Sequence, residues 1–315
     1  AERRDTDFTK RLNALLQQTD DVDFNPLDIG EETPLGGSST TPASIKGLGD
    51  GKQLIQINVV QLKNQIELTY RTNLESGSAA LMIYGASGIG KSDMIKQMAR
   101  KFAAIEQREF IEWSEATQDH RDEIIRNPKH YYIFSVMNAG QLAPEKTSGG
   151  IPDMYKDEPY VTERMYRDMG VWSVRGISGT LFLDELNHAD PHKLNSLFSI
   201  VQEKRAGNHK LAANRMLILC AGNLGRGHTV VDLPQALVNR MKTFWLEVDP
   251  EDWFEWAAEK KINPCIVSFV QSSPEKNFRA EHDPTNKVDK HVGFPCPRNF
   301  VQLNNQIRPL FLKYK

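Results

Sequence analysis

The chain has 315 residues, of which 39% are hydrophobic and 25% charged, and its formal net charge at pH 7 is -2. These totals are ordinary for a globular protein of one large or two modest domains, and the charge balance favours no particular charged partner. The longest apolar runs, such as MLILCA, are too short to cross a bilayer. Three cysteines without a close pair indicate neither a disulfide framework nor a zinc site. We therefore expect a soluble cytoplasmic protein with reduced thiols and no membrane partner.

The first stretch of the chain is acidic and poor in apolar residues. Residues 1–50 contain ten acidic and five basic residues, and they include the run TPLGGSSTTPAS. Low apolar density together with turn-forming residues is typical of chain that packs no core of its own. Residues 1–52 are therefore predicted to be a flexible acidic arm or linker.

The next segment predicts a helix, a strand, a loop and a second helix in that order. Apolar residues from Ile55 to Tyr70 recur at helical spacing and predict an amphipathic helix. The run SAALMIYG then predicts a short buried strand that leads into GASGIGKS, residues 85–92. After this loop, apolar residues from Met94 to Ile105 again keep helical spacing.

Further buried strands are predicted at intervals along the chain. They are YYIFSVM (131–137), GTLFLDEL (179–186), MLILCAG (216–222) and TFWLEV (243–248). Helical patterns separate most of them, which predicts a parallel sheet covered by helices over residues 53–249. Residues 250–315 read as helices alone and predict a small helical domain, whereas residues 143–174 form a long, polar connection without regular structure.

The loop GASGIGKS fits the pattern G-x-x-x-x-G-K-[ST], which cradles phosphate groups. Small residues let successive backbone N–H groups turn inward, and the following helix adds its positive N-terminus. Lys91 would neutralise phosphate oxygens, and the Ser92 hydroxyl would bind Mg²⁺. The alternative is a chance Gly/Ser turn, which the flanking strand and helix disfavour. The predicted nucleotide-binding residues are Gly85, Ala86, Ser87, Gly88, Ile89, Gly90, Lys91 and Ser92.

Polar residues also follow other predicted strands. Asp184 and Glu185 come at the carboxyl end of TLFLDE, where Asp184 would hold Mg²⁺ and Glu185 would polarise an attacking water. Asn223 follows MLILCAG and could reach the γ-phosphate, although an Asn at a strand end is most often a turn residue. Arg240 follows a short helix and is either a surface charge or a group that stabilises negative charge on a neighbouring subunit's nucleotide.

The ordered series GASGIGKS, LFLDELNHA, CAGNLG, LPQALVNRM and CPRNF resembles an AAA+ ATPase, most closely the MoxR-like branch, over about residues 55–312. The resemblance implies an α/β P-loop NTPase sheet flanked by helices, with residues 250–315 as a helical lid. It identifies Lys91 and Ser92 with Walker A, Asp184 and Glu185 with Walker B, and Asn223 with sensor 1. It also identifies Arg240 as an arginine finger acting in trans and Arg298 as the sensor 2 arginine. It implies ATP and Mg²⁺ as ligands and a homo-oligomeric, hexameric ring.

Two other segments have interpretations that depend on this resemblance. Met154 and Tyr155 lie where the branch carries a loop facing the pore of the ring and could grip a client chain, or they pack against their own domain. The stretch 203–215 predicts a hairpin before the sensor 1 strand. Its basic residues, Lys204, Arg205, Lys210 and Arg215, could contact DNA phosphates or an acidic protein, although a solvated hairpin is the simpler interpretation.

Three functions remain at this stage. The first is a ring-forming ATPase that remodels or activates a protein partner, as MoxR-like chaperones do. The second is an ATP-driven nucleic-acid machine, such as a helicase loader or a replication, packaging or restriction ATPase. The third is a nucleotide-binding scaffold with little turnover, which Glu185, Asn223 and Arg240 together disfavour.

Overall fold

The computed structural model describes residues 54–77, 80–141, 150–154, 161–223, 233–247, 249–272 and 296–313. The predicted arm at 1–52 lies outside these residues. Contacts divide the described chain into two compact units. One contains the described residues from 54 to 247 together with 296–299, and the other contains 249–272 and 300–313.

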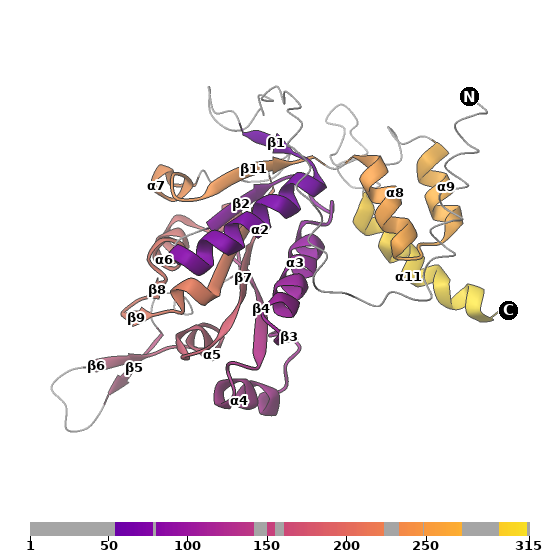
Figure 1. Ribbon diagram of the computed structural model, residues 1–315. Helices are drawn as coiled ribbons and strands as arrows, with labels where there is room; N and C mark the ends of the chain where they lie inside the picture. The colour runs from indigo at the N-terminus through magenta and orange to yellow at the C-terminus, as the bar shows by residue number, and fades with distance from the viewer. Residues whose placement is uncertain are drawn as a thin grey trace. The chain divides into compact units, whose positions relative to one another are not determined.

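The first unit is built on a seven-stranded sheet in the order β1-β11-β2-β10-β7-β4-β3, and every neighbouring pair is parallel (Figure 1). The strands are β1 (Ile55–Ile57), β2 (Ala80–Tyr84), β3 (Glu109–Glu112), β4 (Tyr131–Asn138), β7 (Ser178–Asp184), β10 (Met216–Gly222) and β11 (Lys242–Leu246). The predicted α/β fold, a parallel sheet flanked by helices, is confirmed.

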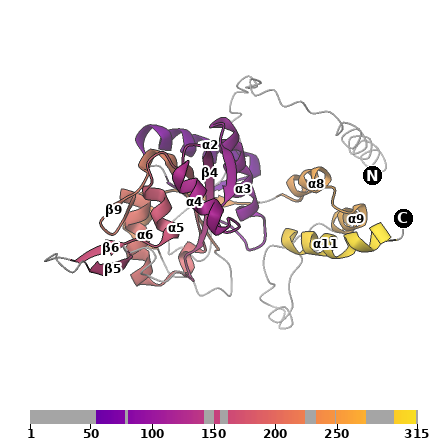
Figure 2. The ribbon, with the colours of Figure 1, turned by 90° about the horizontal axis from the view of Figure 1, so that it is seen from below.

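Helices cover both faces of this sheet. Helices α2 (Val59–Ser76) and α3 (Lys91–Ile105) lie on one face, and α4 (Gln118–Arg126), α5 (Arg167–Gly170) and α6 (Pro191–Glu203) lie on the other (Figure 2). Strand β10 is buried along its whole length. Leu217 and Leu219 pack in the core under α2 and α3, and Ile218 and Cys220 pack in the core under α4, α5 and α6. Burial on both faces explains why the central strands are continuous apolar runs.

The first predicted helix begins later than its apolar spacing indicates. Residues 55–57 form strand β1 beside β11, and Ile55 is exposed instead of lying on the core face of a helix. The cause is Asn58, whose side-chain oxygen accepts from the backbone N–H of Gln61, while the Gln61 side chain accepts from the backbone N–H of Asn58. This reciprocal cap fixes the start of α2 at Val59.

The long connection predicted between β4 and β7 is partly regular. It contains the antiparallel hairpin β5 (Ile151–Met154) and β6 (Val161–Arg164), then α5 and the 3-10 turn η2 (Val171–Ser173). The hairpin predicted at 203–215 is present as β8 (Arg205–Ala206) and β9 (His209–Lys210). Three further short turns are η3 (Leu186–His188), η4 (Ala213–Arg215) and α7 (Gln235–Val238).

The second unit is helical, as the sequence after Pro250 predicts. Helices α8 (Pro250–Glu259), α9 (Pro264–Ser272) and α11 (Pro297–Lys313) supply a separate core that includes Trp253, Ile266, Val270 and Phe300. The Asp249 carboxylate caps α8 by accepting from the N–H of Glu251. In the described part of the chain, no helix has the length and apolar character needed to span a membrane.

Candidate nucleotide site

The register of the sheet brings the ends of four strands together. Tyr84 at the end of β2 pairs with Gly222 of β10, and Asn138 at the end of β4 pairs with Asp184 at the end of β7. Parallel strands share one carboxyl edge, and ligands of open α/β sheets bind there. The residues that directly follow β2, β7 and β10 are therefore neighbours in space although they are far apart in sequence.

The loop between β2 and α3 has the backbone of a phosphate cradle. Gly88 and Gly90 have φ values of +79° and +92°, which side-chain-bearing residues rarely adopt. At Gly85, an added Cβ would lie 2.9 Å from the end of the Ile89 side chain and 3.1 Å from the Leu246 backbone oxygen, so a larger residue would require these neighbours to shift. Helix α3 starts at Lys91, and the backbone N–H groups of its first turn have no partners within the helix. The site thus offers N–H donors and the positive end of the helix.

Lys91 is the most constrained cation of the site. Its side chain is 7% exposed, and its Nζ donates to the carbonyl oxygens of Gly85 and Ala86, each at 2.8 Å, and to Oδ1 of Asn223 at 2.7 Å. Burial lowers the pKa of Lys91 to about 8, while the charge of Asp184 opposes that shift. The ammonium is therefore held between the 85–92 loop and the residue that follows β10, which brings the predicted candidates Lys91 and Asn223 into contact.

Ser92 and Asp184, the two residues predicted to bind Mg²⁺, are in contact. The Ser92 hydroxyl donates to Oδ2 of Asp184 at 3.2 Å, and Oδ1 of Asp184 accepts from the Glu185 backbone N–H at 2.9 Å. Among the described residues no group of three or more His, Cys, Asp or Glu side chains could enclose a metal ion. A hydroxyl next to one carboxylate fits Mg²⁺, which takes oxygen ligands and usually keeps several waters alongside one or two carboxylates and substrate phosphates.

Glu185 occupies an unusual backbone position directly after β7. Its φ of 54° and ψ of 38° lie in the left-handed region, where a residue with a side chain is uncommon. The carboxylate accepts from Nδ2 of Asn138 at 2.7 Å, and Nδ1 of His188 lies 3.9 Å from the same Oε2 atom. Backbone strain and a polar tether together orient this side chain, as is common for functional residues.

Two functional candidates are absent from the sequence-based set. One is Asn138, which is the last residue of β4; applying the rule of polar residues at strand ends to this strand would have found it. The other is Asn187, which is 1% exposed. Its Nδ2 donates to the Asn223 carbonyl at 2.7 Å, and its Oδ1 accepts from the Asn223 N–H at 3.2 Å. Asn187 thereby fixes the backbone of the residue that accepts from Lys91.

The two predicted arginines lie in different places. Arg298 is the second residue of α11, belongs to the unit that contains the sheet, and donates its backbone N–H to the Gly88 carbonyl at 3.1 Å. Arg240 follows α7, and its guanidinium donates to the Ala236 carbonyl at 2.7 Å and lies over the ring of Phe198. The structure therefore places Arg298 beside Gly88 of the 85–92 loop, and it places the guanidinium of Arg240 over Phe198 of α6.

The segments predicted to contact a client give a mixed result. Met154 ends β5, while Tyr155 lies outside the described residues. Lys204 is only 2% exposed, so it cannot contact phosphates as the hairpin interpretation proposed. It lies at the turn from α6 to β8 with a φ of 52°, and its Nζ has no hydrogen-bond partner among the residues that the structure describes. Burial lowers the pKa of Lys204 to about 8. The sequence pattern of the 203–215 stretch does not indicate that Lys204 is buried.

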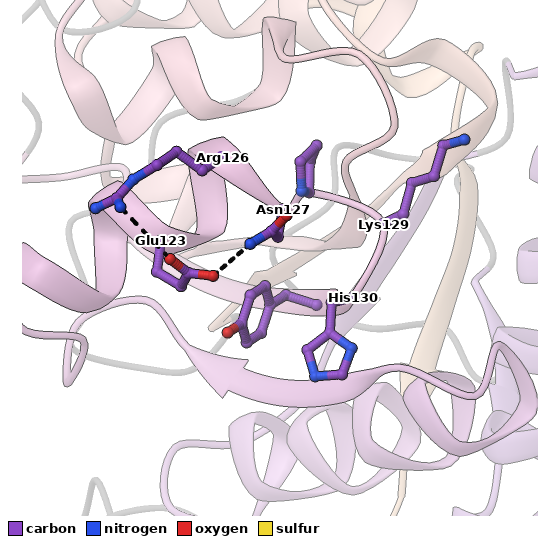
Figure 3. A pocket seen from close by; sticks show the side chains of 7 residues that line it. Glu123, Arg126, Asn127, Lys129 and His130 are labelled. Carbon is purple, nitrogen blue, oxygen red and sulfur yellow. Dashed lines mark hydrogen bonds and ion pairs between the residues drawn. The ribbon is translucent and has the colours of Figure 1, made fainter.

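A surface hollow of about 640 Å³ lies at the other end of β4 (Figure 3). It is lined by Glu123, Arg126, Asn127, Pro128, Lys129, His130 and Tyr131. Glu123 already accepts from Asn127 and pairs with Arg126 at 3.8 Å. An eight-residue strand spans roughly 25 Å, so this hollow is separate from the carboxyl-edge site.

No model of a known protein family matches this sequence, and no curated protein matches it either. Several solved structures are similar to the chain. PCH-2 of C. elegans has a TM-score of 0.36 and 12% identity, over 81% of this chain and 58% of that chain. A putative ATPase from Cytophaga hutchinsonii has a TM-score of 0.35 and 13% identity, over 79% of this chain and 62% of that chain. The RuvB Holliday junction branch migration motor of Thermotoga maritima has a TM-score of 0.38 and 12% identity, over 81% and 63%.

The chain thus spans about three fifths of the length of these three structures. At these TM-scores and identities the likeness carries no argument about activity or partners. The chemical case for this chain therefore depends on its own residues.

Proposed function

We propose that this chain binds Mg-ATP at the carboxyl edge of its sheet and hydrolyses it as a ring-forming AAA+ ATPase of the MoxR-like type, using the energy to remodel or activate a protein partner. The observation that carries the proposal is the meeting of Lys91, Ser92, Asp184, Glu185 and Asn223 at one edge, through contacts of 2.7 to 3.2 Å. Each of these groups has a distinct task in phosphoryl transfer to water.

In this proposal, the 85–92 loop and the first turn of α3 bind Mg-ATP. The N–H groups of residues 85–92 would surround the phosphates, and Lys91 would exchange one or more of its three oxygen partners for phosphate oxygens. Ser92 and Asp184 would hold Mg²⁺, which when bound neutralises charge that builds on the phosphate oxygens. The lowered pKa of Lys91 reflects a desolvated site, in which charge interactions are stronger than in water.

In this proposal, Glu185 and Asn223 promote the hydrolysis of ATP. The Glu185 carboxylate would orient and polarise the attacking water, with its second oxygen held by Asn138. The Asn223 side chain would turn from Lys91 towards the γ-phosphate, because Asn187 keeps its backbone in place while the amide rotates.

Arg240 supports the ring. Arg240 is exposed, and its guanidinium lies over the ring of Phe198 in α6. An arginine stabilises transition-state charge only where it reaches a phosphate. We assign Arg240 to the nucleotide of the adjacent subunit and Arg298 to the nucleotide of its own subunit. Each site would then be complete only in an oligomer, for which the resemblance suggests a hexamer.

The β8–β9 hairpin offers a nucleic acid fewer unengaged cations than its sequence indicates. Of the four basic residues around the β8–β9 hairpin, Lys204 is buried, Arg205 donates to the Asn208 carbonyl, and Arg215 pairs with Glu106 at 3.3 Å. Phosphate binding needs several accessible cations, because each contact contributes through counterion release. This hairpin therefore gives the nucleic-acid alternative little support.

The deciding experiment mixes two variants that each lose most of their activity alone. Arg240→Ala keeps Glu185 but offers no finger, and Glu185→Gln offers the finger but lacks the base. In a mixed ring, Glu185 of one subunit meets Arg240 of its neighbour, so we expect ATPase activity to return at part of the sites. Nucleotide affinity of each variant and the mass of the mixed assembly are measured in parallel.

Two results would contradict the proposal. A mixed ring of full mass without recovered activity removes the trans assignment of Arg240. A wild-type protein that stays monomeric, and whose rate per chain is constant over the concentration range, removes the ring. Adding single-stranded or duplex DNA to the same assay tests the client, because strong stimulation would favour the nucleic-acid alternative.

A further inference from the structure

The side chain of Arg240 is held by an aromatic ring of another element. Its guanidinium carbon lies 5.3 Å from the centroid of the Phe198 ring, and one nitrogen donates to the Ala236 carbonyl at 2.7 Å. Phe198 is partly buried and packs against the core beneath α6. The core therefore holds the phenyl ring in place, while one face of the ring contacts the Arg240 guanidinium.

We propose that Phe198 is a positioning residue for Arg240, which holds the guanidinium in the orientation that the neighbouring subunit's nucleotide requires. This inference rests on the proposed trans role of Arg240. A cation over an aromatic face is attracted by the ring quadrupole, and the flat guanidinium stacks on it well. The contact restricts a long, flexible side chain and uses one of its five donors for Ala236, which leaves the others free to meet a phosphate.

The location of Phe198 adds a mechanical consequence. Helix α6 begins at Pro191, only a few residues after Glu185 and the η3 turn. Phe198 lies seven residues into the helix, roughly 10 Å along its axis. The finger that a subunit offers to its neighbour thus rests on the helix that follows its own acidic pair. If η3 shifts with the state of the nucleotide in the same subunit, α6 would shift with it, and Phe198 would change the position of Arg240.

The test compares two substitutions of the ring. Phe198→Leu keeps apolar volume against the core but removes the π-surface, and Phe198→Tyr keeps both. For Phe198→Leu we expect kcat to fall by about five- to tenfold, with nucleotide affinity, KM and assembly mass unchanged and the Hill coefficient for ATP reduced. Phe198→Tyr should restore kcat to within about twofold of wild type.

Two further variants separate positioning from packing. Ile200→Val loses a buried methyl group from the same helix without touching Arg240, so it should lower stability and leave kcat intact. Phe198→Leu added to Arg240→Ala should cause no further loss of kcat, because the guanidinium that the phenyl ring orients is already absent. An additional loss in the double variant, or an equal loss of kcat in Phe198→Leu and Phe198→Tyr, would show that the ring acts through packing and overturn the inference.

Failure of this inference and failure of the proposed function give different results. A normal kcat in Phe198→Leu, combined with a strong loss in Arg240→Ala, overturns the positioning role alone. A normal kcat in Arg240→Ala overturns the finger itself and the positioning role with it. A loss in both variants, with rescue by Phe198→Tyr, supports both.

Discussion

Asn138, the last residue of β4, and Glu185, which directly follows β7, are joined by a hydrogen bond of 2.7 Å from the amide Nδ2 to the carboxylate Oε2. The bond holds one oxygen of the proposed base and leaves the other available to a water. Asn138→Ala removes this restraint, whereas Asn138→Asp places a second carboxylate against the first. We therefore expect kcat to fall a few-fold in Asn138→Ala and about tenfold further in Asn138→Asp.

Steady-state ATPase assays with parallel nucleotide-binding titrations check this order of effects. Both variants should retain nucleotide affinity, because the side-chain hydrogen bonds of Asn138 go to Glu185 and Gln141 and not to the 85–92 loop, to which we assign binding. Equal rates in the two variants would mean that the contact between Asn138 and Glu185 does not influence hydrolysis.

The clamp of Asn187 on Asn223 predicts a combined loss of stability and turnover. Asn187→Ala leaves the N–H and the carbonyl of Asn223 without their side-chain partners in a largely buried place. We expect the free energy of unfolding to fall by about 2–3 kcal/mol in urea titrations, and kcat to fall as well because Asn223 is no longer fixed.

A matched control for this clamp is Asn214→Ala. The Asn214 amide donates to the carbonyls of Leu74 and Glu75, at the opposite end of β10 from the site. Its removal should lower stability slightly and leave kcat unchanged. A normal kcat in Asn187→Ala at a temperature where the variant is folded would show that the clamp is only structural.

Lys204 predicts an unusual dependence of stability on pH. Burial lowers its pKa from 10.5 to about 8, so the unfolded chain binds more protons than the folded chain between these two values. Its contribution therefore makes the protein more stable as pH rises from about 8 to about 10.5, and the cost of burying the ammonium is fully present below pH 8. Lys204→Met should raise the free energy of unfolding at pH 7 by about 2–3 kcal/mol.

The gain from Lys204→Met should shrink as the pH is raised through this window, in unfolding titrations at a series of pH values. Lys210→Met is the control, because Lys210 is exposed on the same hairpin and should change neither the stability nor its pH dependence. An equal gain for Lys204→Met at pH 7 and at pH 10 would contradict the burial of a charged amine.

Gly179 predicts a steric limit in the centre of the sheet. It is paired with Ile133 across β4 and β7, and a Cβ at position 179 would lie 2.0 Å from the Ile133 carbonyl oxygen. That atom is backbone of a central strand, so it cannot move aside cheaply. Gly179→Ala should lower the free energy of unfolding by about 2–4 kcal/mol, whereas Gly170→Ala, with 3.7 Å to its nearest neighbour, should be tolerated.

The sequence predicts the central strands and the site residues that follow them, because their signals are strong and local. The strands at 80–84, 178–184 and 216–222 are buried on both faces, so an apolar run of matching length predicts each of them. Lys91 follows a glycine pattern whose phosphate-binding use is specific. The parallel register then places Asp184 and Asn223 near it without further information.

The remaining features depend on contacts that no local pattern contains. β3, with the sequence EFIE, is a short edge strand with charged ends, and it forms because β4 offers a partner. The exposed Ile55 continues the helical spacing of α2 by chance, and only the cap at Asn58 shows where the helix starts. Asn187 acquires its role because Gly222 has no side chain in that place, where a Cβ would lie 2.7 Å from the Asn187 oxygen.

The order of the strands has a consequence for how the protein is made. β10 lies between β2 and β7 in the sheet, but it is the last of the three to leave the ribosome. A nascent chain that has reached Asp184 already contains the phosphate loop and the acidic pair, yet the two strands that carry them still lack the strand that separates them. Lys91 also has no Asn223 to donate to until residue 223 is made. Nucleotide bound at the proposed site would therefore stabilise the sheet only after the central strand has inserted, too late to act as an early folding template.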